Sequence, residues 1–168
     1  MTDSGGIKYL LRITPEEKSA SRAEMFRMQK AVEALGIPMC RPIEYGRCRE
    51  GVYILSSWID GEDADKAVPR LDHSLQYELG LEAGKILKKI HSIPAPPDQR
   101  DWESRFSGKT ERKIKMYEEC PIKFDGADKI IDYINSNRKL LSGRPQTFQH
   151  GDYHIGNMMI ENGGIVII

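Results

Sequence analysis

The chain has 168 residues, a length that suits one domain or two small lobes sharing an interface. Lysine plus arginine and aspartate plus glutamate both number 25, so the formal net charge is zero and no basic run argues for a nucleic-acid partner. Three cysteines without metal-ligand spacing predict reduced thiols, and neither an apolar leader nor a membrane-spanning stretch is recognisable. We therefore expect a cytoplasmic protein with no nucleic-acid partner and no membrane association. Its oligomeric state cannot be read from the sequence.

The first predicted element is a short apolar strand over residues 7–14. Successive side chains of a strand point to opposite faces, so Leu10 and Arg12 lie on the same face. Two interpretations of the basic side chain stay open at this point. Arg12 either contacts a bound group or occupies a strand edge in solvent.

A helix is predicted over residues 14–35. Thr14, followed by proline and by a glutamate three residues later, indicates a capping box, and Gly36 indicates the helix end. An apolar stripe at helical spacing marks the buried side, and Glu24 lies beside that stripe. An inward Glu24 carboxylate could pair with Arg12, whereas charged residues on helices are usually solvated.

Two antiparallel strands are predicted next, over residues 40–47 and 52–59. Beyond them the apolar pattern becomes helical, with a strongly periodic helix that ends near residue 91 and a stiff proline-rich connection. Two more helical patterns follow, over residues 102–118 and 127–141. Their acidic side chains either face a cationic substrate or, more simply, form solvated faces.

The stretch FQHGDYHIGNMMI carries the main functional pattern. It places His150, Asp152 and Asn157 in the order His-x-Asp-x-x-x-x-Asn, the spacing of a kinase catalytic loop. Such an aspartate can accept a proton from an attacking hydroxyl, and such an asparagine can bind magnesium. Short strands are predicted on both sides of the loop, and the two that follow it, over residues 158–160 and 165–168, form a hairpin that would hold it rigidly. The alternative is a polar turn whose side chains cap backbone groups.

The octapeptide HGDYHIGN, with a second histidine at position 154, resembles the aminoglycoside phosphotransferase family, a branch of the protein-kinase-like fold that acts on small molecules. The resemblance implies a partial two-lobe α+β fold. Residues 1–59 would form a small antiparallel sheet with one helix, and residues 60–168 a mainly helical lobe carrying the catalytic loop. It also implies transfer of the γ-phosphoryl group of ATP, with Mg²⁺, to a hydroxyl of a small molecule. The acceptor would be an aminoglycoside, or else a macrolide, a choline-like amine or another metabolite.

By the same resemblance five residues would bind the nucleotide: Leu10, Arg12, Glu24, Ser57 and Trp58. Leu10 would cover the adenine, and Arg12 would contact phosphates while Glu24 orients it. Ser57 and Trp58 lie where the chain of this family crosses between lobes and its backbone hydrogen-bonds adenine.

At the loop, the resemblance makes Asp152 the catalytic base, with support from His150, and Asn157 a magnesium ligand. Two parts of the family are not recognisable, the glycine-containing hairpin before the first strand and the magnesium-binding aspartate after the last. The chain thus resembles only the middle of the family, as a truncated enzyme or an inactive remnant would. We expect marginal stability, no measurable kinase activity of this chain alone, and self-association through apolar surface exposed at residues 165–168.

Overall fold

A computed structural model describes residues 1–168 and divides them into two compact units. The first unit joins Met1–Ile93 to Gln149–Ile168, and the second is Pro94–Phe148. Small antiparallel sheets and helices make this an α+β protein, as predicted. The lobe boundary predicted after residue 59 lies inside the first unit and stays a prediction. No helix of the chain combines the length and the apolar character that crossing a membrane requires.

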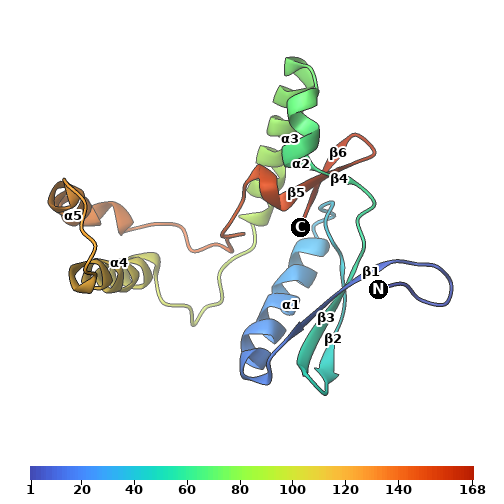
Figure 1. The fold of residues 1–168 in the computed structure, drawn as a ribbon, viewed down its shortest axis with the longest axis horizontal. Coiled ribbons are helices and arrows are strands. Elements are labelled where there is room, and N and C mark those ends of the chain that lie inside the picture. Colours follow the sequence, from blue (N-terminus) through green and yellow to red (C-terminus); the bar gives the residue numbers. More distant parts are fainter. The chain divides into compact units, whose positions relative to one another are not determined.

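The first unit begins with an antiparallel sheet in the order β1–β3–β2 (Figure 1). Its strands are β1 Tyr9–Thr14, β2 Pro42–Cys48 and β3 Gly51–Ser57. In the register of β1 with β3, Leu10 lies opposite Ser56 and Arg12 lies opposite Ile54. Side chains of opposed residues share one face of a sheet. These four residues therefore lie on a common face.

Helix α1, Ser19–Glu33, packs against β2 and β3. It begins later than predicted, because Glu16–Lys18 form a separate 3₁₀ turn, η1. Thr14 belongs to β1, where its hydroxyl donates to the carbonyl of Val52, and no side chain caps α1. The predicted capping box is therefore wrong, since pairing within the sheet holds Thr14 in extended backbone.

A second sheet, in the order β4–β5–β6, unites segments far apart in the sequence. Its strands are β4 Glu62–Asp63, β5 Met158–Glu161 and β6 Gly164–Ile167. Gly61 approaches β5 so closely that a Cβ atom there would lie 2.5 Å from the carbonyl oxygen of Ile160. The hairpin predicted after the loop is confirmed. The strand predicted before the loop is not formed, and only an isolated bridge joins Pro94 to Thr147 there.

Strand β6 is buried, which contradicts the expected exposure of its apolar side chains. Residues 165–167 are only 4% to 6% exposed, and Ile168 alone is about half exposed. Strand β5 pairs with one edge of β6, and helix α3, His73–Ile90, packs against β6. At its other edge, Ile167 accepts a hydrogen bond from the N–H of Cys40 and donates one to the carbonyl of Pro38, both at 3.0 Å. The segment before β2 thus covers the edge expected to face water.

The remaining helices of the first unit are α2 Ala64–Ala67, η2 Val68–Arg70 and α3 His73–Ile90. Asp72 caps α3, since its carboxylate accepts the N–H of Leu75. The second unit contains α4 Trp102–Glu119, α5 Ala127–Ser136 and η3 Arg138–Leu141. Asp101 caps α4, where the hydroxyl and N–H of Ser104 lower the pKa of its carboxyl.

Candidate active site

The predicted catalytic loop is anchored on α3 through Tyr153. The Tyr153 hydroxyl donates to the carbonyl of Ala83 at 2.7 Å. Burial raises the pKa of the Tyr153 phenol, and the nearby Glu82 carboxylate adds to the effect, so the group stays a donor. Gly151 adopts a φ of 87°, in the left-handed region that glycine enters freely, and the chain turns there towards Asp152.

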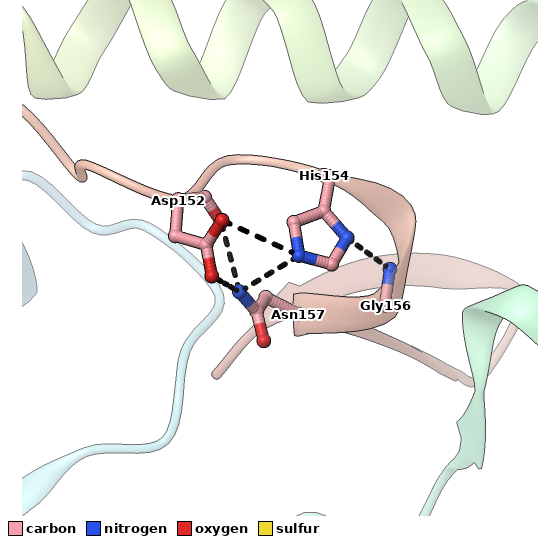
Figure 2. A network of polar contacts seen from close by, with 4 residues as sticks. All are labelled: Asp152, His154, Gly156 and Asn157. Atoms are coloured by element: carbon pink, nitrogen blue, oxygen red, sulfur yellow. Dashed lines mark hydrogen bonds and ion pairs between the residues drawn. The ribbon is translucent and has the colours of Figure 1, made fainter. Parts of the chain in front are cut away.

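Asn157 holds the carboxylate of Asp152 (Figure 2). Its side-chain N–H₂ donates to the main-chain carbonyl and to Oδ2 of Asp152, each at 2.9 Å. The amide oxygen of Asn157 consequently points away from Asp152. The Asp152 side chain is nevertheless 76% exposed, so it is both oriented and open to a ligand. Asp152 and Asn157 are thus in direct contact within the loop, and the catalytic and magnesium-binding roles predicted for them stay predictions.

His154, to which the sequence interpretation gave no role, completes this network. Its Nδ1 accepts the N–H of Gly156 at 3.0 Å, so a neutral ring must carry its proton on Nε2. Nε2 lies 3.5 Å from Oδ1 of Asp152. Nε2 is also 3.3 Å from the side-chain nitrogen of Asn157, a contact between two donors in this tautomer. A Cβ atom on Gly156 would lie 2.8 Å from Cε1 of His154, so a larger residue there would displace the His154 ring.

His150 packs against the ring of Tyr153. Its ring meets that of Tyr153 edge-on, with centroids 5.3 Å apart, and its Nδ1 is buried without a hydrogen-bond partner. The supporting role predicted for His150 stays a prediction.

Arg12 lines a cavity of about 40 Å³ between α1 and the first sheet. The cavity is lined by residues from β1, β3, α1, the segment before β2 and the position after β6: Leu10, Arg12, Met25, Gln29, Cys40, Ile54, Ser56 and Ile168. The N–H of Ile168 donates to the carbonyl of Asn157 at 3.2 Å. The end of β6 therefore links this cavity to the catalytic loop.

Glu24 does not meet Arg12 in the structure. Its carboxylate forms a two-bonded ion pair with Arg27, with nitrogen–oxygen distances of 2.6 Å and 2.8 Å. These hydrogen bonds lower the pKa of Glu24. Residues three apart on a helix are neighbours, and this pair lies on the exposed side of α1. The orienting role predicted for Glu24 stays a prediction.

The polar groups of Ser57 form hydrogen bonds with other residues of the chain. Its N–H donates to the carbonyl of Arg41 and its hydroxyl accepts the N–H of Arg41, both at 2.9 Å. Its carbonyl accepts a hydrogen bond from the thiol of Cys40 at 3.0 Å. Trp58 is 49% exposed, and the ammonium of Lys8 lies 5.9 Å from its ring centroid. The adenine-binding role predicted for this segment stays a prediction.

The side chains near Asp152 supply few metal ligands. No group of three or more histidine, cysteine, aspartate or glutamate residues is arranged to hold a metal ion. The amide oxygen of Asn157 is a ligand of the kind that Mg²⁺ accepts, and Mg²⁺ often takes its other ligands from water and substrate phosphates. The site therefore fits a magnesium ion that arrives with a nucleotide, and not one held by protein alone.

Comparison with known proteins gives a sequence-family match and a set of similar folds. The profile of the Phosphotransferase enzyme family (APH) matches residues 1–168. A comparison with curated protein sequences finds no match.

Three similar solved structures have low sequence identity. Aminoglycoside phosphotransferase APH(3'')-Id from Streptomyces rimosus, with ADP and streptomycin, is 15% identical with a TM-score of 0.65, over 98% of this chain and 66% of that one. The gentamicin complex of APH(2")-IIa is 15% identical with a TM-score of 0.67, and the match covers 95% of this chain and 57% of that one. Spectinomycin phosphotransferase APH(9)-Ia, with ADP and spectinomycin, is 16% identical with a TM-score of 0.52, and the match covers 99% of this chain and 57% of that one. The chain thus has their fold and spans less than two thirds of their length.

Proposed function

Because the chain belongs to the Phosphotransferase enzyme family, we propose that it transfers the γ-phosphoryl group of ATP to a hydroxyl of a small molecule. The observation that carries this proposal is the exposed Asp152 carboxylate, held by Asn157 and faced by His154. A carboxylate that is fixed yet accessible is what a general base for a hydroxyl acceptor requires.

In this proposal each side chain has one task. Asp152 accepts the proton of the attacking hydroxyl, so that the acceptor oxygen bonds to phosphorus as the bond to ADP breaks. Arg12 contacts the phosphates, as a guanidinium that stays charged at every physiological pH. Magnesium would be held by the amide oxygen of Asn157 together with the phosphates, and when bound it neutralises their charge. Leu10, Ser57 and Trp58 stay the candidates for adenine contact.

An aminoglycoside-type antibiotic is the acceptor we propose first. The similar structures were solved as complexes with streptomycin, gentamicin and spectinomycin. Two of them hold ADP, and a further APH(2")-IIa complex holds ATP with streptomycin. These ligands belong to those proteins, and they support the choice of acceptors to test here.

The test is a phosphoryl-transfer assay on the purified chain with Mg²⁺ and γ-labelled ATP. The acceptors are an aminoglycoside, spectinomycin, a macrolide and choline, and Asp152→Asn is the matched inactive variant. Label on one acceptor with the wild type and none with the variant would support the proposal, and would contradict the expectation from the sequence that this chain alone shows no measurable kinase activity. Nucleotide binding without transfer to any acceptor would instead identify an inactive remnant that retains a nucleotide site. Absence of nucleotide binding would overturn the proposal.

A further inference from the structure

We propose that Gln29, rather than Glu24, is the α1 residue that positions Arg12 towards a nucleotide phosphate. The inference rests on the proposed function, because it takes a phosphate as the group that Arg12 contacts. It adds a specific orienting group, which is a neutral amide instead of a carboxylate.

The helix geometry favours this assignment. Met25 and Gln29 are four residues apart on α1, so they lie on one side of it, and both line the cavity that Arg12 lines. Glu24 points to the other side and is occupied by Arg27. Gln29 is therefore the polar residue that α1 contributes to this cavity.

The hydrogen-bonding state of Gln29 points the same way. Its Oε1 is buried and has no hydrogen-bond partner. A buried acceptor without a partner is destabilising, and in native structures such an atom calls for an explanation. Arg12, at the same cavity, carries five N–H donors and no acceptor. One donor given to Gln29 would satisfy the amide oxygen and leave the others for a phosphate.

The charge of Arg12 already reaches into the cavity. Burial raises the pKa of the Cys40 thiol, and the positive charge of Arg12 opposes that rise. The planar guanidinium of an arginine presents its N–H donors in a fixed fork, so one acceptor can set its direction. A neutral acceptor is then sufficient, because it fixes the direction of the guanidinium without cancelling the charge that binds phosphate.

The experiment is a double-mutant cycle on Mg–ADP binding, measured by calorimetry on the full 168-residue chain. The variants are Arg12→Ala, Gln29→Leu and the pair, with Gln29→Glu to restore an acceptor and Lys30→Gln as a control at an exposed position of α1. We expect Gln29→Leu to weaken binding about tenfold, and the pair to be no weaker than Arg12→Ala alone. Gln29→Glu should recover most of the loss, and Lys30→Gln should bind as the wild type does.

Two outcomes would overturn the inference while the proposed function stands. One is additive losses for Arg12→Ala and Gln29→Leu, and the other is coupling of Arg12 to Glu24→Gln instead. A wild-type chain that binds no Mg–ADP would overturn the proposed function itself. In that case the free energies of unfolding in urea, measured for the same variants without nucleotide, show whether the Arg12 and Gln29 side chains interact. Circular dichroism verifies that each variant folds.

Discussion

At the scale of single residues, the geometry of the loop depends on donors that point inward at one carboxylate. The side-chain N–H₂ of Asn157 and the Nε2–H of His154 both face Asp152, and the N–H of Gly156 fixes the tautomer of His154. Preorganised donors of this kind hold a base in one orientation at no cost during the reaction. Two substitutions test whether this orientation matters for turnover.

Asp152→Asn should lower kcat by roughly 100- to 10,000-fold, the range typical for loss of a general base. The Kd for Mg–ATP should change little, because the carboxylate acts in the chemical step. Steady-state kinetics on the best acceptor gives kcat, and calorimetry gives the Kd. Asp65→Asn, at an exposed position of α2, is the control. A variant that kept most of its turnover would remove Asp152 from the reaction.

Gly156→Ala should lower kcat about tenfold, with little change in the KM for ATP. The new methyl group would lie within 2.8 Å of Cε1 of His154, so the ring must leave its place opposite Asp152. His154→Ala should cause a similar loss, and the two changes together should be no worse than either alone. Gly84→Ala in α3, where an added Cβ meets nothing within 4 Å, is the control. Unchanged turnover in Gly156→Ala would contradict the positioning role of His154.

At the scale of elements, the loop depends on its attachment to α3, and the second unit presents an apolar groove between its helices. The Tyr153 hydroxyl ties residues from distant parts of the chain together through one bond to Ala83. The groove between α4 and α5 has a volume of about 390 Å³, with Ile130 and Lys113 among its lining residues. Both features can be tested without a substrate.

Tyr153→Phe should lower the free energy of unfolding by about 0.5–1.5 kcal/mol, the usual contribution of one hydrogen bond. Because the folded state raises the pKa of this phenol above its ordinary value of 10.0, the associated stability is fully present below about pH 10. It is lost as pH rises through the raised pKa, and Tyr153→Phe should remove this part of the alkaline destabilisation. Urea unfolding between pH 8 and 11 measures both effects. Tyr77→Phe, at a 69% exposed position, should change neither.

The α4–α5 groove should bind the dye anilinonaphthalene sulfonate, whose rings match the apolar walls and whose charge matches Lys109 and Lys113. Ile130→Lys should reduce the fluorescence gain by at least half, because Ile130 lies in the groove and is 51% exposed. Leu75→Lys removes a similarly exposed apolar side chain from α3 and is the control. Equal effects of the two variants would show that the dye binds elsewhere.

At the scale of the whole molecule, every residue assigned to ATP or to catalysis belongs to the first unit. Saturating Mg–ADP should therefore slow hydrogen exchange in Met1–Ile93 and Gln149–Ile168 and leave Pro94–Phe148 unchanged, because a ligand stabilises the parts of the folded state that it contacts. Exchange followed by mass spectrometry distinguishes the two units. Protection centred on the second unit would contradict the nucleotide site proposed here.

Local sequence patterns predicted the elements and the loop. The long helices and the hairpin after the loop each depend on residues within a few positions of one another, and each was confirmed. The five-residue spacing predicted that Asp152 and Asn157 belong to one short loop, whereas the hydrogen bonds between them were not predicted. Thr14 shows the limit of such patterns. Its local sequence predicted a helix start, but Thr14 pairs with Val52 in the first sheet instead.

Tertiary structure decided everything that depends on which surfaces meet. The sequence placed a carboxylate and an amide on neighbouring turns of α1, but only the tertiary structure showed that Gln29 lines the same cavity as Arg12 while Glu24 binds Arg27. Likewise, the four β-branched residues at the end of the chain predicted an exposed strand, until the segment before β2 was found to pair with its free edge. A helix face or a strand edge acquires its role from long-range contacts, and their partners lie too far along the chain for any local pattern to name them.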